Sequence, residues 1–224
     1  MNMLKIQELF DLERTLAADF LSRYEYPWEA LPHIRAFILQ LGKTLSETEY
    51  NRLSDDIWVS KEAPVAPTAS ITGPTIIGPG TELRPGAFIR GGVLIGEGCV
   101  VGNSTEMKNA IIFDGVQIPH FNYVGDSILG YKAHMGAGAV TSNVKSDRTL
   151  ITVHAQGEQI ETGLKKFGAM VGDYAEIGCN TVLNPGTVVG RHSNIYPCSC
   201  VRGTVPADSI YKNSGETVRK EERI

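Results

Sequence analysis

The sequence predicts a mainly β solenoid preceded by a small α-helical region. Composition is the first observation, because nearly all of the 24 Gly and 11 Pro follow residue 60. The second is a period of six: from Val65 onward, large apolar residues recur at every sixth position. This period fits short strands that are cut by a corner after each hexapeptide. Stacked coils then bury the same position of every repeat.

Residues 1–62 are expected to form the N-terminal helical region. Apolar residues recur there with helical spacing in two stretches, which Pro27 and Pro32 separate. The first stretch consists of Leu9, Leu12, Leu16 and Phe20, and the second of Ile34, Phe37, Ile38, Leu41 and Leu45. Apolar stripes of this kind are usually packing surfaces, so we expect a helical cap or docking element.

Residues 63–210 carry the hexapeptide repeats, and residues 211–224 form a C-terminal tail. Gly often follows the apolar residue directly, as in "IGEGCV" and "VGDYAE", and it tolerates the positive φ of a corner. The apolar positions are Val65, Ile71, Ile77, Leu83, Ile89, Ile95, Val101, Met107 and Phe113, and then Val171, Ile177, Leu183, Val189, Ile195 and Val201.

The repeat breaks in two places, and both breaks are candidate functional segments. The six-residue phase slips at 118–128, around "IPHFNYVGDSILG". Residues 141–168 have no hexapeptide phase, so we expect an extended loop, with a short hairpin around Gln156–Gly157. Loops held on a rigid scaffold often carry function.

Charge and cysteine content exclude several classes. A formal net charge of −4 argues against a protein that coats nucleic acid. The charged N-terminus and the lack of any apolar run near ~18 residues indicate a cytoplasmic protein with reduced thiols. Among the four cysteines, Cys198 and Cys200 form a close pair, but no second pair lies at zinc-site spacing, so we expect no metal.

The hexapeptide period resembles that of the left-handed parallel β-helix acyltransferases, in which three hexapeptides make one triangular coil. A more specific resemblance lies in the ordered motifs "RPGAFIRGG", "VGNSTEMKNA", "IPHFNYVGDSILG", "HMGAGAVTSN" and "TGLKKFGAMVGD". They are similar to the C-terminal acetyltransferase domain of bifunctional glucosamine-1-phosphate acetyltransferases/UDP-N-acetylglucosamine pyrophosphorylases, and to archaeal-type sugar-1-phosphate nucleotidylyltransferases. Only the helical region precedes the repeats, without a phosphate-binding Gly loop, so we expect no nucleotidyl transfer.

The resemblance implies a catalytic base and a set of acceptor-binding residues. His120 takes the place of the general base, because an imidazole suits proton removal from an attacking amine. Arg84 and Lys108 match positions that bind the sugar phosphate, and Tyr123 and Asn143 match positions that contact the sugar or amine. Two further acceptor contacts are Lys166, from its own or another subunit, and His134, which replaces a family Asn.

The resemblance also implies binding of acetyl-CoA as co-substrate. Ala137 in "GAGA" matches a backbone donor to the thioester oxygen, and Cys179 and Pro197 match the lining of the coenzyme groove. The family's late basic residue for the coenzyme phosphates has no counterpart, because Ser214 falls there. Its substitutes are Lys212, Arg219 or Lys220.

The predicted function is acetyl-CoA-dependent N-acetylation of an amino-sugar 1-phosphate, either glucosamine 1-phosphate or galactosamine 1-phosphate, by a homotrimer without metal. A non-catalytic sugar-nucleotide-binding or scaffolding module is one alternative, and an acyltransferase with a different acceptor is another. A γ-class carbonic anhydrase needs two zinc-binding histidines five residues apart, and no two of the five here have this spacing: His33, His120, His134, His154 and His192.

Overall fold

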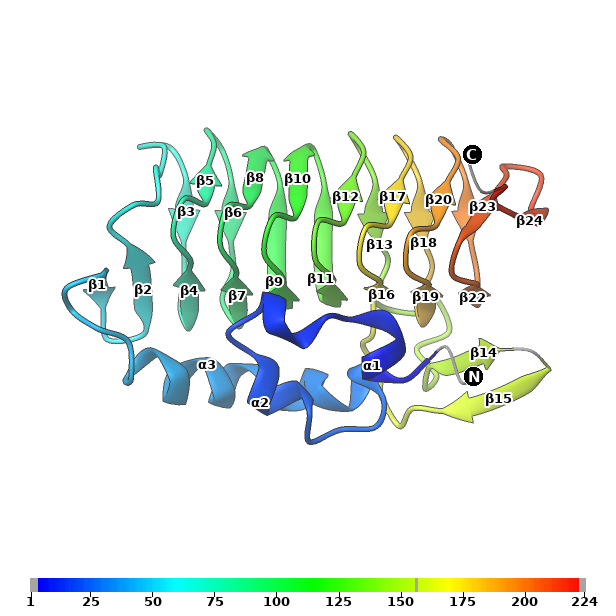
Figure 1. Ribbon diagram of the computed structural model, residues 1–224, viewed down its shortest axis with the longest axis horizontal. Helices are drawn as coiled ribbons and strands as arrows, with labels where there is room; N and C mark the ends of the chain where they lie inside the picture. Colours follow the sequence, from blue (N-terminus) through cyan, green and yellow to red (C-terminus); the bar gives the residue numbers. More distant parts are fainter. Residues whose placement is uncertain (1–3, 156, 222–224) are drawn as a thin grey trace.

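The structure is a computed structural model that describes residues 4–155 and 157–221. The repeats wind into a parallel β-helix whose axis runs along the long dimension of Figure 1. Short helices lie along one side, and a two-stranded hairpin projects near the C-terminal half. The predicted fold class is confirmed: a β-helix of hexapeptide repeats, with a small N-terminal helical region and an extended loop.

Each coil places one strand on each of three faces. Face 1 consists of β3 (Ser70–Ile71), β6 (Phe88–Ile89), the first halves of β9 (Glu106–Ile112) and β11 (Tyr123–Leu129), β13 (Val140–Thr141), β18 (Val182–Leu183) and β21 (Cys200–Val201). Face 2 consists of β4 (Thr75–Ile77), β7 (Val93–Ile95), the second halves of β9 and β11, β16 (Ala169–Val171), β19 (Thr187–Val189) and β22 (Thr204–Val205). Face 3 consists of β5 (Glu82–Leu83), β8 (Val100–Asn103), β10 (Gln117–His120), β12 (His134–Met135), β17 (Glu176–Ile177), β20 (Asn194–Ile195) and β23 (Ser209–Tyr211).

Two successive coils in the middle of the β-helix are one residue shorter than the coil before them. Ile77 pairs with Ile95, 18 positions later, but Ile95 pairs with Ile112 and Ile112 with Leu129, each 17 positions later. Both coils are shortened at the corner between faces 1 and 2, which we call corner B. Here β9 and β11 run through the corner as seven-residue strands instead of ending before it.

The one residue that turns each shortened corner is polar and has a positive φ. These residues are Asn109 (φ 46°) and Asp126 (φ 49°), and Asn and Asp tolerate this conformation better than most residues. The first slip therefore comes earlier than the predicted break at 118–128. As a consequence Ile112, not Phe113, takes the inward position, and the Phe113 ring packs on Phe10 with centroids 5.1 Å apart.

The N-terminal segment of residues 4–49, here called the helical cover, lies along face 2 (Figure 1). It contains α1 (Ile6–Leu9), η1 (Leu12–Arg14), α2 (Ala18–Leu21), η2 (Pro27–His33) and α3 (Ile34–Gly42). Helix α3 packs on β4, β7 and β9. In every face 2 strand except the two-residue β22, the middle residue points outward. These residues are nevertheless fully buried under the helical cover and its neighbours: Ile76, Leu94, Ile111, Ile128, Met170 and Val188.

Two details of the N-terminal region differ from the sequence prediction. The first apolar stretch forms three short helical segments instead of one helix, and its Leu16 is 46% exposed. The end of the region is not helical: β1 (Tyr50–Ser54) and β2 (Ile57–Ser60) form an antiparallel hairpin. Strand β2 then pairs in parallel with β4 and so begins face 2.

The predicted loop leaves the β-helix at corner B and returns to the same place. Phe167 N–H donates to Asn143 O at 3.0 Å, and Thr141 still pairs with Leu183 of the next coil. The predicted hairpin is present as β14 (Thr152–Ala155) and β15 (Glu158–Glu161), whereas Gln156 lies outside the described residues. At the C-terminal end, β24 (Thr217–Arg219) turns back antiparallel to β23.

The longest helix among the described residues, α3, has nine residues. This is far below the roughly 20 apolar residues that a membrane-spanning helix requires, and none of the described helices qualifies as one.

Candidate active site

Four of the predicted site residues stack in one column at corner A, the corner between faces 3 and 1. Backbone hydrogen bonds link the coils: Gly138 N to His120 O at 3.0 Å, Asn180 N to Ala137 O at 2.8 Å, and Cys198 N to Cys179 O at 2.8 Å. The predicted base and the predicted coenzyme residues therefore occupy successive coils. In order along the axis they are His120, Ala137, Cys179 and Pro197.

The imidazole of His120 lies on the outside of the prism. His120 ends β10 and is exposed, and the next residue, Phe121, has a φ of 53° and is 63% exposed. The ring makes no hydrogen bond or ion pair with any described residue. A ligand at corner A would therefore meet an imidazole that is exposed and has no partner in the described part of the chain.

Asn122 fixes the turn that carries His120, although the sequence alone did not single it out. Its side chain is buried at 3% exposure and makes three hydrogen bonds. The Oδ1 atom accepts from His120 N at 3.1 Å, and Nδ2 donates to Gly136 O at 2.8 Å and to Ala139 O at 3.0 Å. It therefore ties the His120 turn to the coil that carries Ala137.

The backbone N–H of Ala137 is available to donate a hydrogen bond to an oxyanion. Its N–H has no acceptor among the described residues, while its carbonyl is used within the column. The next residue, Gly138, has a φ of +72°, and a Cβ there would lie 2.3 Å from Asn180 Oδ1. Glycine at this position thus avoids a clash with the Asn180 side chain and permits the positive φ that follows Ala137.

Tyr123 lies on face 1 between corners A and B. Its hydroxyl oxygen accepts from Asn143 Nδ2 at 3.3 Å, so the phenolic O–H remains able to donate to a ligand. Burial raises the pKa of Tyr123 above its ordinary value of 10.0, and the nearby carboxylates of Asp126 and Glu106 add to this effect. Tyr123 is consequently a neutral donor near pH 7.

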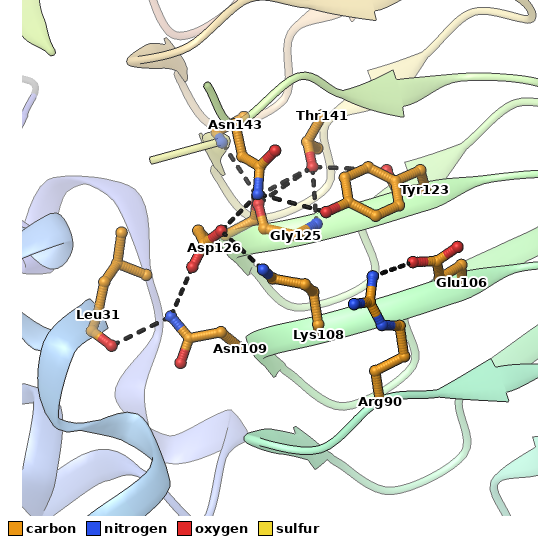
Figure 2. A network of polar contacts seen from close by, with 12 residues as sticks. Leu31, Arg90, Glu106, Lys108, Asn109, Tyr123, Gly125, Asp126, Thr141 and Asn143 are labelled. Atoms are coloured by element: carbon orange, nitrogen blue, oxygen red, sulfur yellow. Dashed lines mark hydrogen bonds and ion pairs between the residues drawn. The ribbon is translucent and has the colours of Figure 1, made fainter. Parts of the chain in front are cut away.

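A ladder of polar side chains follows corner B (Figure 2). Asn109 Nδ2 donates to Asp126 Oδ1 at 2.9 Å and to Leu31 O of the helical cover at 3.2 Å, and Asn143 Nδ2 donates to Asp126 Oδ2. Asp126 is only 5% exposed. The ladder of Asn109, Asp126 and Asn143 therefore joins the helical cover, the shortened coils and the start of the loop.

Cationic side chains gather beside this ladder. Lys108 Nζ lies 3.9 Å from Asp126 Oδ2, and Arg90 pairs with Glu106 at 2.6 Å (Figure 2). A cleft of about 360 Å³ opens here between the helical cover and the β-helix, and Lys166, at the end of the loop, also lines it. Lys108 and Lys166 were both predicted from the sequence, whereas Arg90 was not.

Two predicted acceptor residues lie away from this cleft. Arg84 belongs to corner A, two coils before His120, and pairs with Glu82 at 3.1 Å. The structure thus places Arg84 and Lys108 at different corners, with face 1 between them. His134 lies on face 3, where its Nδ1 is 2.7 Å from Glu176 Oε2.

The expected substitutes for the late basic residue lie at the C-terminal end of the β-helix. Arg219 and Lys220 line a cavity of about 780 Å³ together with Tyr196, whose neighbour Pro197 belongs to corner A. Lys212 instead pairs with Glu216 at 3.0 Å. Ser214 is exposed, and its hydroxyl accepts from Glu216 N. Within residues 4–155 and 157–221, no three His, Cys, Asp or Glu side chains converge to hold a metal ion.

Comparison with known proteins finds relatives of the β-helix. Residues 71–165 match the family model described as the GMPPB C-terminal domain. The chain is 34% identical over 109 residues to the bifunctional sugar-1-phosphate nucleotidylyltransferase/acetyltransferase of Sulfurisphaera tokodaii, covering 49% of this chain and 27% of that protein. It is 29% identical over 152 residues to the bifunctional protein GlmU of Staphylococcus epidermidis, covering 68% of this chain and 30% of that protein.

The predicted resemblance is confirmed. It extends over about half of this chain in the archaeal alignments, and the aligned part spans less than a third of the length of these relatives. Solved structures align more distantly. A putative acetyltransferase from Bacillus cereus has 16% identity and a TM-score of 0.41, with coverage of 73% of this chain and 77% of that one. A point mutant of perosamine N-acetyltransferase from Caulobacter crescentus, crystallised with CoA and GDP-perosamine, has 16% identity and a TM-score of 0.37. The alignment covers 74% of this chain and 57% of that one.

Proposed function

We propose that the protein transfers an acetyl group from acetyl-CoA to the amine of an amino-sugar 1-phosphate. The observation that carries this proposal is the column at corner A, where the exposed His120 lies one coil before Ala137 and in line with Cys179 and Pro197. A coenzyme extended along this column would bring its thioester close to His120. The relationship to proteins named as acetyltransferases supports the same reaction.

The acceptor would lie across face 1, between corners A and B. Tyr123 offers a phenolic O–H at the centre of this face, and Lys108, Asn143 and Lys166 lie toward corner B. Lysine ammonium groups would hold the phosphate, while the amine of the sugar would point toward His120. A carbohydrate acceptor suits the mixture of amide, hydroxyl and cationic groups along this path.

The reaction follows from these positions. The imidazole of His120 takes a proton from the acceptor amine as its nitrogen attacks the thioester carbonyl carbon. The C–N bond forms, and the developing oxyanion accepts a hydrogen bond from Ala137 N–H. The C–S bond then breaks, and the proton passes from the imidazolium to the CoA thiolate, which leaves as the thiol.

The phosphates of the coenzyme would lie at the C-terminal end of corner A. The cavity beside Tyr196 carries Arg219 and Lys220, which supply the cationic groups that the position of Ser214 lacks. The homotrimer implied by the family resemblance is part of the same proposal. The molar mass of the native protein, measured by light scattering, tests it against the 24.3 kDa of one chain.

Release of free CoA thiol tests the reaction. We expect thiol release when the protein is mixed with acetyl-CoA and either glucosamine 1-phosphate or galactosamine 1-phosphate. A general base contributes roughly 10²–10⁴-fold, so His120→Ala should lower kcat by that factor, while His154→Ala, exposed on β14, should not change it. Full turnover by His120→Ala would remove the assigned base. Inactivity of the wild type with a panel of amino-sugar phosphates would favour a non-catalytic binding module.

A further inference from the structure

One cationic side chain of the helical cover, that of Arg35, reaches the cleft at corner B. Arg35 of α3 lines this cleft, and its Nη2 donates to Gly73 O at 3.3 Å. Its side chain passes over Gly91 and Gly92, where an added Cβ would lie 3.2 Å from Arg35 Nη1 and 3.0 Å from Arg35 Cγ, respectively. Any larger residue at these two positions would crowd the path of the Arg35 side chain to Gly73 O.

The cleft has an excess of positive charge. Four cationic side chains line it: Arg35, Arg90, Lys108 and Lys166. Two of them face a carboxylate, because Arg90 pairs with Glu106 and Lys108 lies near Asp126. Arg35 and Lys166 have no carboxylate partner among the described residues, and Lys166 is exposed. The cleft therefore retains about two positive charges that no described carboxylate neutralises.

This charge matches a phosphate monoester, which carries about −1.5 to −2 charges at pH 7 and offers three acceptor oxygens. A guanidinium donates two parallel hydrogen bonds to such a group, and an ammonium adds a point charge. Arg35 and Lys166 approach from different segments, the helical cover and the end of the loop. Together with Lys108 on β9, they line the cleft from three separate segments of the chain.

We propose that Arg35 completes the phosphate subsite of the acceptor, so that the helical cover is part of the substrate site and not only a lid over face 2. This inference rests on the proposed function for the identity of the acceptor. Binding of a phosphate monoester to the cleft, however, does not require acetyl transfer. The two ideas can therefore fail separately.

Calorimetric titration with inorganic phosphate at low ionic strength tests the subsite directly. We expect the wild type to bind, and Arg35→Ala and Lys166→Ala each to weaken binding roughly tenfold or more, since hydrogen bonds to charged groups are the strong ones. His120→Ala should bind phosphate as the wild type does. The matched control is Arg23→Ala, an exposed arginine of the helical cover that lines a different cleft. Lys166 has no described partner, so its variant reports on binding even where loss of Arg35 impairs folding.

Steady-state kinetics distinguish the phosphate of the acceptor from those of the coenzyme. We expect Arg35→Ala to raise KM for glucosamine 1-phosphate roughly tenfold, to leave KM for acetyl-CoA unchanged, and to be partly restored in Arg35→Lys. A rise in KM for acetyl-CoA instead would assign the subsite to the coenzyme and overturn the proposal. Unchanged phosphate affinity in both Arg35→Ala and Lys166→Ala would also overturn it. If the wild type binds phosphate but transfers no acetyl group, and the two variants lose phosphate binding, the subsite is upheld and the proposed reaction is rejected.

Discussion

Replacement of Asn122 by alanine should both destabilise the protein and slow the reaction. The substitution removes three hydrogen bonds from a buried site, two donated at 2.8 and 3.0 Å and one accepted at 3.1 Å. At about 1 kcal/mol for each bond, the free energy of unfolding should fall by about 3 kcal/mol. For a chain of this size the melting temperature should drop by about 6–12 °C.

Chemical denaturation and thiol-release kinetics measure the two effects of this variant. Because the His120 turn loses its tie to the Ala137 coil, kcat should fall while KM for acetyl-CoA changes little. Asn51→Ala, exposed on β1, is the matched control and should stay within about 0.5 kcal/mol of the wild type. Asn122→Ala with an unfolding free energy within 1 kcal/mol of the wild type and full kcat would refute the positioning role.

An aspartate at position 122 extends this test to pH. The carboxylate of this variant can still accept a hydrogen bond from His120 N. The carbonyl oxygens of Gly136 and Ala139, however, lose their N–H donor and face a negatively charged oxygen. Asn122→Asp should therefore be less stable than Asn122→Ala at pH 7. The carboxyl pKa in the folded state should be raised above its unfolded value, so part of the lost stability should return as pH falls.

Three further predictions concern other parts of the chain. Gly125→Ala should raise KM for the acceptor about tenfold in steady-state assays, because the new Cβ would lie 2.5 Å from Tyr123 Oη and displace the hydroxyl. Three of the four thiols should react with a disulfide reagent in the native protein and Cys99 only on unfolding, because burial raises the pKa of Cys99 from 9.0 to about 12. The neutral thiol favours folding fully below about pH 9, and this contribution is lost as pH rises toward 12. Leu94→Ala, under the helical cover, should lower the unfolding free energy by about 2–5 kcal/mol, whereas Phe88→Ala on the open face 1 should cost about 0.5 kcal/mol in the same denaturation assay.

Hexapeptide spacing predicted the β-helix well because one physical rule repeats along it. Each sixth residue, such as Ile77, Ile95 or Ile177, meets its equivalent in the next coil and is buried there. The same rule failed at Phe113, because the corner at Asn109 is shorter by one residue and moves the inward position to Ile112. A spacing count cannot reveal this, since both neighbours are large and apolar.

A second signal was present in the sequence but was not interpreted. Strands of face 2 read as continuous apolar runs, such as "VLI" at 93–95 and "AMV" at 169–171, whereas strands of faces 1 and 3 alternate. Continuous runs are typical of strands buried on both sides. They predict that something covers face 2, although not that the helical cover does so.

The candidate site was predicted in part. The motifs located His120, Lys108, Tyr123, Asn143 and Lys166, whose chemistry can be recognised from residue type. Asn122 and Asp126 act through hydrogen bonds to backbone and to neighbouring coils, and Arg35 reaches the cleft from a segment far away in the sequence. Contacts of this kind depend on which coils and helices lie side by side, and no local motif encodes that arrangement.

The loop between Asn143 and Phe167 begins and ends at adjacent points of corner B. Strand β13, before the loop, pairs with β18, after it, as in an uninterrupted β-helix. The length of its exposed parts can thus change without shifting the coils, whereas Ile151 and Val153 are buried and are constrained to stay apolar. Under the proposed function, in which Lys166 binds the acceptor, acceptor preference could consequently change through insertions or deletions in this one segment. The column of His120, Ala137, Cys179 and Pro197 at corner A would not be changed by such insertions or deletions.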